Sequence, residues 1–162
     1  MLSLESLAIR QPFAHLSLPL PKFPWNQLKR LTLSTPPLSQ CASIVSWCVQ
    51  LEHITLFIWP SKDRLPPVFI VSQTVTSATL KWVEEEGCQN LFPSLQFPKL
   101  HTLELDSCPL PADSIYPFIP DSPSITSLCL TDFGFVHNLP VLLRLLPTIT
   151  HFSFQNSRFC QI

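Results

Sequence analysis

The stretch FPKLHTLELDSC (Phe97–Cys108) carries a spaced set of leucines on which the interpretation of the whole chain depends. The leucines stand at Leu100, Leu103 and Leu105, so their spacing is apolar-x-x-apolar-x-apolar. Leu103 and Leu105 alternate with polar residues, which is typical of a β-strand with one buried face. One copy of this pattern predicts only a strand of an ordinary domain. Several copies at a fixed interval would predict a repeat.

The same spacing recurs along almost the whole chain. Successive copies start 24, 23, 24, 25, 25 and 24 residues apart. The seven copies are LESLAI (4–9), LKRLTL (28–33), LEHITL (51–56), VTSATL (75–80), LHTLEL (100–105), ITSLCL (125–130) and ITHFSF (149–154). The fourth copy is degenerate, because Ala78 replaces a large apolar residue. Loose apolar triplets are common, but seven at a near-constant interval indicate an internal repeat.

A period of 23–25 residues with this spacing resembles the leucine-rich repeat. The resemblance implies an α/β repeat fold: a leucine-rich-repeat solenoid of about seven copies, with a curved parallel sheet and short helices or irregular return segments. The copies share one core, since no copy buries its apolar residues alone. Only Cys108 occupies the Asn/Cys position that follows the strand in this family. We expect the fourth strand to be the poorest, and the strands to be centred near residues 6, 30, 53, 77, 102, 127 and 151.

The segments between the strands predict short or irregular returns. Trp47, which lies in the return segment between copies 28–33 and 51–56, is expected in the core. WPSKDRLPPVF (59–69) is rich in proline and charge, and it predicts a projecting loop or an irregular turn. We predict one domain over residues 1–162, lacking caps, with an irregular fourth copy around 59–92. Short helices are predicted within CASIVSWCVQ (41–50), ADSIYPFI (112–119) and NLPVLLRLLP (138–147).

Composition and motifs argue against several classes of function. Apolar residues make up 46% of the 162 residues, and the formal net charge is −1, which gives no support for nucleic-acid or membrane binding driven by charge. The N-terminal sequence lacks an export signal, so we expect a cytoplasmic or nuclear chain with reduced cysteines. The six cysteines form no C-x-x-C pair, and two glycines are too few for a phosphate-binding loop. No catalytic residue, cofactor or metal site is predicted, and the chain is not expected to be an enzyme.

The resemblance extends to one group of leucine-rich-repeat proteins. Strand phrases such as FPKLHTLELDSC and SPSITSLCL, joined by PLPADSIYPFIPDSP, resemble the repeat region of fungal F-box proteins. In that family an F-box recruits a ubiquitin-ligase scaffold, and the repeats hold the protein to be ubiquitinated. No stretch here resembles an F-box. The resemblance therefore implies a substrate-recognition region alone, as a fragment or a truncated relative, which would reach a ligase scaffold only through a domain missing from this chain.

Strand alternation indicates which residues bind a partner. The third, fifth and seventh positions of each copy should face outward, on the concave side of the sheet. These positions are small, polar and rich in hydroxyl groups, which suits a polar segment of a protein partner. The alternative is that they reflect ordinary strand propensity alone. The predicted protein-binding residues are Arg30, His53, Thr55, Phe57, Lys81, Thr102, Glu104, Asp106, Ser127, Thr131 and His151.

Two other functions fit the same sequence. One is a leucine-rich-repeat scaffold or inhibitor without a ligase link. The other is a GTPase-regulating repeat protein, for which Arg10 or Arg30 would be the candidate residue. We also expect the isolated chain to self-associate through an end, because copies 4–9 and 149–154 each leave an apolar face without a neighbour.

Overall fold

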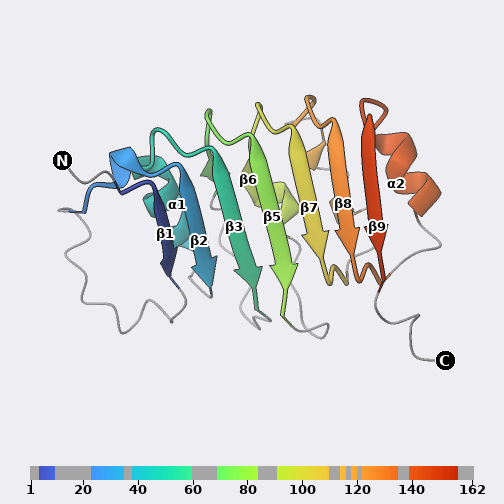
Figure 1. The fold of residues 1–162 in the computed structure, drawn as a ribbon, viewed down its shortest axis with the longest axis horizontal. Coiled ribbons are helices and arrows are strands. Elements are labelled where there is room, and N and C mark those ends of the chain that lie inside the picture. The colour runs from blue at the N-terminus through green and yellow to red at the C-terminus, as the bar shows by residue number, and fades with distance from the viewer. Residues whose placement is uncertain are drawn as a thin grey trace.

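Seven strands form one parallel sheet in the order β1-β2-β3-β5-β7-β8-β9 (Figure 1). The structure, a computed structural model, describes residues 4–9, 23–34, 38–59, 69–83, 91–109, 114–115, 118–119, 122–134 and 139–156. The strands are β1 (Ser6–Ile9), β2 (Arg30–Ser34), β3 (His53–Ile58), β4 (Ile70–Val71), β5 (Ser77–Trp82), β6 (Leu95–Gln96), β7 (Thr102–Asp106), β8 (Ser127–Thr131) and β9 (His151–Gln155). The helices are α1 (Leu38–Trp47), α2 (Leu139–Leu145) and the short 3₁₀ helices η3 (Trp25–Gln27) and η4 (Phe92–Ser94). This is an α/β arrangement with few helices.

Each strand of the sheet pairs with its neighbour in the same register. Ser6 lies opposite Arg30, Arg30 opposite His53, and the offset stays between 23 and 25 residues through the last pair, Ser127 and His151. The predicted parallel pairing is therefore confirmed. The strands begin at the predicted positions instead of being centred there, because pairing continues past the third apolar residue, as at Ser34 opposite Phe57.

The prediction that the fourth strand is the poorest is wrong. That strand is β5, which has six residues and pairs along its whole length with β3. Ala78 is buried, and backbone groups make the pairing, so a small inward side chain does not interrupt it. The predicted irregular segment 59–92 thus contains a regular strand. Residues 60–68 and 84–90 of that segment lie outside the described residues.

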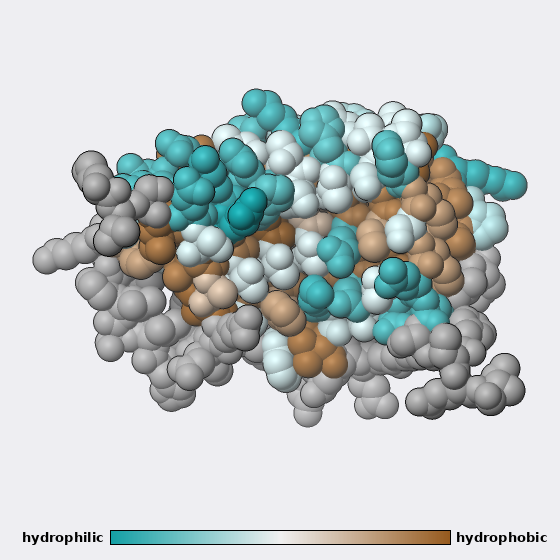
Figure 2. Space-filling view, in the orientation of Figure 1, coloured by the Kyte–Doolittle hydropathy of each residue, from teal (hydrophilic) through white to brown (hydrophobic). Residues whose placement is uncertain are grey.

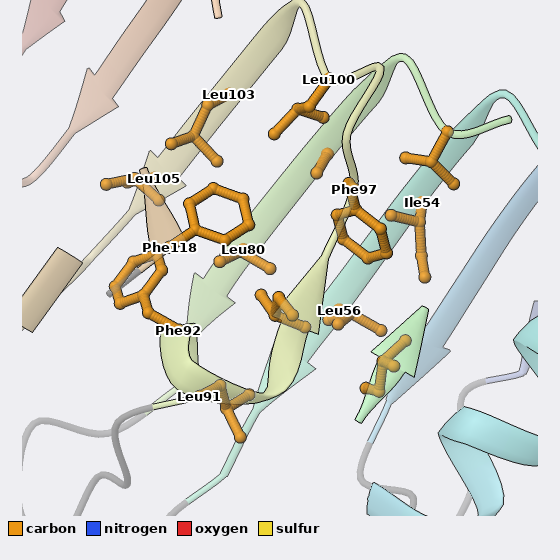
Figure 3. Packing of buried hydrophobic residues seen from close by; sticks show 14 of the residues in the cluster. Ile54, Leu56, Leu80, Leu91, Phe92, Phe97, Leu100, Leu103, Leu105 and Phe118 are labelled. Atoms are coloured by element: carbon orange, nitrogen blue, oxygen red, sulfur yellow. The ribbon is translucent and has the colours of Figure 1, made fainter. Parts of the chain in front are cut away.

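A second layer, which the sequence did not predict, lies behind the sheet. β4 and β6 pair in parallel, with Ile70 opposite Leu95, and β4 lies against α1. In Figure 1, α1 and β6 lie behind the main sheet, and α2 lies at the β9 end of the molecule. Three fully buried aromatic rings fill the space between the layers (Figure 3): the Phe118 centroid is 5.6 Å from that of Phe92 and 6.5 Å from that of Phe97.

The inward side chains of the sheet form the other half of the core. In the five interior strands the inward apolar residues are buried: Leu31, Leu33, Ile54, Leu56, Ala78, Leu80, Leu103, Leu105, Leu128 and Leu130. Burial decreases at both ends of the sheet. Leu4, just before β1, is 37% exposed, and Phe152 in β9 is 42% exposed. Among the described strands, β1 and β9 each have a neighbour on one side only, so their inward residues lose half of the lateral contacts that interior strands have.

The two α-helices correspond to two of the three predicted segments. α1 begins three residues before the predicted 41–50, and α2 lies within the predicted 138–147. Of the predicted helix 112–119, only 114–115 and 118–119 are described. The expectation for Trp47 is wrong: it is the last residue of α1 and 39% exposed, because its ring lies over Trp25 at 5.9 Å instead of entering the core. Neither described α-helix has the length and apolar character needed to cross a bilayer.

Two residues with positive φ mark the ends of neighbouring strands. Ser107 (φ 55°) follows β7 and Asp132 (φ 49°) follows β8, and they occupy corresponding positions. The Ser107 N–H donates to the Thr131 carbonyl, and the Asp132 N–H donates to the Gln155 carbonyl. The left-handed conformation turns the chain inward after each strand, and Cys108 and Phe133 are consequently buried.

Candidate functional site

The outward side chains of the seven strands form one continuous surface, which we call the outer face. It is the side of the sheet opposite the second layer, and it alternates strictly with the core, as the half-buried and buried residues of β3 and β5 show. All of the predicted binding residues lie on it. The third positions supply Arg30, His53, Thr102, Ser127 and His151, the fifth supply Thr55 and Glu104, and the seventh supply Phe57, Lys81, Asp106 and Thr131.

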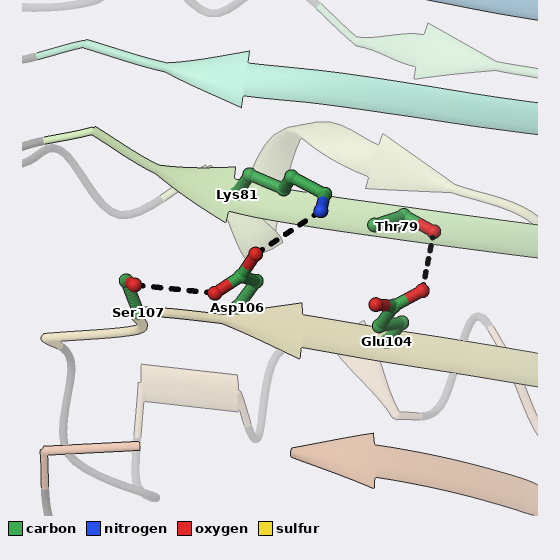
Figure 4. Close-up of polar contacts among 5 residues, drawn as sticks. All are labelled: Thr79, Lys81, Glu104, Asp106 and Ser107. Carbon is green, nitrogen blue, oxygen red and sulfur yellow. Dashed lines mark hydrogen bonds and ion pairs between the residues drawn. The ribbon is translucent and has the colours of Figure 1, made fainter. Parts of the chain in front are cut away.

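The centre of the outer face carries an ion pair between neighbouring strands (Figure 4). Lys81 on β5 lies opposite Asp106 on β7, and their Nζ and Oδ2 atoms are 3.1 Å apart. The second oxygen of Asp106, Oδ1, accepts a hydrogen bond of 3.2 Å from the Ser107 hydroxyl. Both charges are therefore already compensated within the sheet. This position offers a partner a neutral polar contact instead of a free charge.

Glu104, the other acidic residue near the centre of the outer face, also has a hydrogen-bond partner within the sheet. The Thr79 hydroxyl donates a 3.0 Å hydrogen bond to Oε2 of Glu104, its opposite residue on the next strand (Figure 4). Thr79 was not among the predicted binding residues, although it lies on the outer face. Its distance of 25 residues from Glu104 equals the repeat interval at that point, so the spacing alone could have identified this pair.

The uncompensated positive charge lies nearer β1. Arg30 is exposed, His53 is half-buried, and neither makes an ion pair with any other described residue. At the entry to the strands, Lys29 Nζ lies 3.8 Å from Glu5 Oε1, but both side chains are well exposed, so this pair contributes little to stability. Among the described residues, the outer face thus has a free positive charge at Arg30 on β2. At its centre, on β5 and β7, it has a compensated ion pair and the hydrogen-bonded but still negative carboxylate of Glu104.

Most of the outward side chains in the middle of the outer face are small and polar. Figure 2 looks onto this side, and pale and teal side chains cover most of its middle. The fifth positions of β2, β3 and β5 are all threonine: Thr32, Thr55 and Thr79. Short side chains of this kind let another polypeptide approach the strands closely. Phe57, half-buried at the end of β3, is the one aromatic residue among the outward residues of the described strands.

Cys41 and Cys48 are buried, and they supply no reactive thiolate to the outer face. Burial raises the pKa of the Cys41 thiol to about 12 and that of Cys48 to about 11, so both remain protonated at neutral pH. Cys129 lies on the outer face opposite Ser153. Within the described ranges, no group of three or more His, Cys, Asp or Glu side chains is arranged to hold a metal ion.

The Lys81–Asp106 pair is expected to contribute only modestly to stability. In a double-mutant cycle of Lys81→Ala and Asp106→Ala, the coupling energy should be about 0.2–1 kcal/mol, because both side chains keep contact with water. Urea unfolding of the four proteins measures it, and the coupling should decrease as salt is added. A larger coupling that persists at high salt would contradict this description of the pair.

No protein-family model, curated protein or solved structure matches this chain. The outer face and the repeated pattern of the sequence are therefore the features of this chain that bear on its function.

Proposed function

We propose that this chain is a leucine-rich-repeat solenoid that holds a polar segment of another protein on its outer face, without catalysing a reaction. One observation carries the proposal. Seven parallel strands in a constant register align small polar side chains in rows across the whole sheet, on a side that the described part of the second layer does not cover. Solenoids of stacked repeats use extended surfaces of this kind to bind other proteins.

The regular pairing supports the solenoid part of the proposal. Every strand of the sheet pairs with the strand of the next sequence copy, at an offset of 23–25 residues. The corresponding apolar residues of the interior copies are buried, which is what stacked units with a shared core require.

The charges of the outer face suggest the chemistry of the partner. A segment lying across the strands would meet the positive charge of Arg30, then Phe57, and then the neutralised Lys81–Asp106 pair. We propose that it carries a carboxylate near Arg30 and an apolar side chain against Phe57, with polar uncharged residues beyond. Binding should weaken as salt is added, because the Arg30 contact is exposed.

We further propose that the bound protein is a substrate of an F-box-type ubiquitin ligase. The support is the resemblance of FPKLHTLELDSC and SPSITSLCL to repeats of fungal F-box proteins, together with a polar outer face suited to holding another protein. In this role the chain would hold the substrate, and an F-box on another domain would recruit the ligase.

Substitution of Phe57 tests the binding proposal. Proteins captured from an extract of the source cells by the wild-type chain are identified, and the affinity of each purified candidate is measured by calorimetry. Phe57→Ala should reduce the binding free energy of the true partner by about 2 kcal/mol, which lowers its affinity roughly 30-fold. The reason is that aromatic residues within an interface often contribute most of the binding energy. Phe69→Ala is the matched control: it removes an exposed ring beside β4, off the outer face.

Two outcomes separate the parts of this proposal. A partner that binds wild type and Phe57→Ala equally tightly would contradict binding at the outer face. A partner that depends on Phe57 but does not accumulate in cells lacking the gene would contradict the ligase role, and would favour the ligase-independent scaffold.

A further inference from the structure

The β9 edge of the sheet combines exposed aromatic surface with backbone groups that no described strand pairs with. Phe152 and Phe154 occupy the positions that Leu128 and Leu130 hold in β8, where both leucines are buried. Phe152 is instead 42% exposed, and Phe154 is only partly buried. Among the described residues, no strand pairs with the far side of β9. Figure 2 shows hydrophobic colouring gathered at the β9 end and again at the β1 end.

A series of backbone hydrogen bonds shows what this edge can accept. At each of the six strand junctions, one carbonyl just before a strand accepts two successive N–H groups from the next copy, as the Thr126 carbonyl does from Thr150 and His151. The accepting residues are Glu5, Lys29, Glu52, Thr76, His101 and Thr126. Thr150 is the next in this series, and no described residue donates to its carbonyl.

Strand alternation extends this argument along β9. The His151 N–H donates toward β8, so the backbone groups of Ser153 and Gln155 face β8 as well. The N–H and C=O groups of Phe152 and Phe154 therefore face the open edge. An incoming parallel strand would find an acceptor at Thr150 and alternating donors and acceptors at both phenylalanines.

The β1 edge has the complementary arrangement. The Glu5 carbonyl faces β2, where it accepts from Lys29 and Arg30, so the backbone groups of Ser6 and Ala8 face away from the sheet. The inward residue Leu7 is only partly buried, whereas its counterpart Leu31 is buried. This edge offers donors where β9 offers acceptors, and it has the same deficit of apolar contact.

We propose that β9 of one copy of this chain pairs in parallel with β1 of a second copy, so that the sheet continues from one molecule into the next. The junction repeats the register of the six existing ones. It places Ser6 opposite His151, Leu7 opposite Phe152, Ala8 opposite Ser153 and Ile9 opposite Phe154. The occupant is a second copy because its β1 presents aliphatic residues at both inward positions that face the phenylalanines, and small residues at the outward ones.

The contact is heterologous, since two different edges meet, and each added copy leaves one edge of each kind open. Association is therefore open-ended, and the outer face continues across the junction. Pairing of two β9 strands with each other would instead give a closed dimer, and would not involve β1.

Light scattering of the full chain over a wide concentration range tests the proposal. The weight-average mass of the wild type should rise from the monomer value of 18.4 kDa to more than twice that value, without a plateau at the dimer. Phe152→Lys should keep the mass at the monomer value by placing a charge on the β9 edge. Val49→Lys is the control, because it makes the same kind of change at a residue that is 61% exposed and outside both edges, and it should behave as wild type.

A second variant blocks the opposite edge. Ala8→Pro removes an N–H that faces away from β2, so the intramolecular pairing is retained and the protein should stay folded and monomeric. Mixing Phe152→Lys with Ala8→Pro leaves one intact β1 edge and one intact β9 edge, and should give a one-to-one dimer of twice the monomer mass. Circular dichroism confirms that each variant is folded.

Several results would overturn the proposal. A wild type that remains monomeric at every concentration would do so, as would assembly that Phe152→Lys leaves unchanged. Assembly that Phe152→Lys abolishes but Ala8→Pro leaves at a discrete dimer would identify β9–β9 pairing instead. None of these measurements uses a protein bound to the outer face. A negative result would therefore contradict the proposed self-association without bearing on the proposed binding function.

Discussion

Replacing Phe92 by alanine is expected to lower the free energy of unfolding by about 3–5 kcal/mol. Phe92 is fully buried in η4, and its ring centroid lies 6.0 Å from that of Trp82 and 5.6 Å from that of Phe118. Its ring thus links the end of β5 to the second layer (Figure 3). Removing it leaves a cavity lined by two large rings, which cannot shift far without disturbing their own packing. Equilibrium unfolding in guanidinium chloride measures the effect.

Phe69→Ala is the control for this prediction. It deletes the same ring from a residue that is 52% exposed, so the loss should be much smaller than for Phe92→Ala. A similar decrease in the free energy of unfolding for the two variants would contradict the buried position of Phe92 between the rings of Trp82 and Phe118.

Leu103→Ala should lower the free energy of unfolding by about 2–5 kcal/mol, because it also leaves a cavity in the core. Leu103 is the second residue of β7 and fully buried, and its neighbours in the sheet are Ala78 on β5 and Leu128 on β8. The substitution would place two alanines side by side on the inward face, and the methyl group of Ala78 is too short to fill the new cavity. Urea unfolding, with the midpoint and slope compared with wild type, measures the loss.

The adjacent residue supplies the comparison. Thr102 precedes Leu103 in the same strand but points to the outer face, so Thr102→Ala should change stability by less than about 0.5 kcal/mol. Equal effects at Thr102 and Leu103 would mean that the inward and outward faces of β7 have been assigned the wrong way round.

The faces and the register of the main sheet could be predicted from the sequence. The apolar spacing assigns each strand residue to one face, because side chains alternate with a period of two. The near-constant interval predicts which residues lie opposite each other, such as Lys81 and Asp106, before any coordinates are known. Strand length was harder to predict. Ala78 suggested a weak strand, but backbone pairing does not depend on the size of one inward side chain.

The second layer and the exposure of the end strands were decided only by the tertiary structure. The return segments do not share one apolar pattern, so the sequence gives no signal for the pairing of β4 with β6, for the buried rings around Phe92 or for the exposed ring of Trp47. The sequence by itself determined the seven strands and their outer face, since these follow from local alternation and a repeated interval. The same pattern gives Leu128 and Phe152 equivalent positions, yet one is buried and the other is open, because burial depends on the neighbours that folding places on each side.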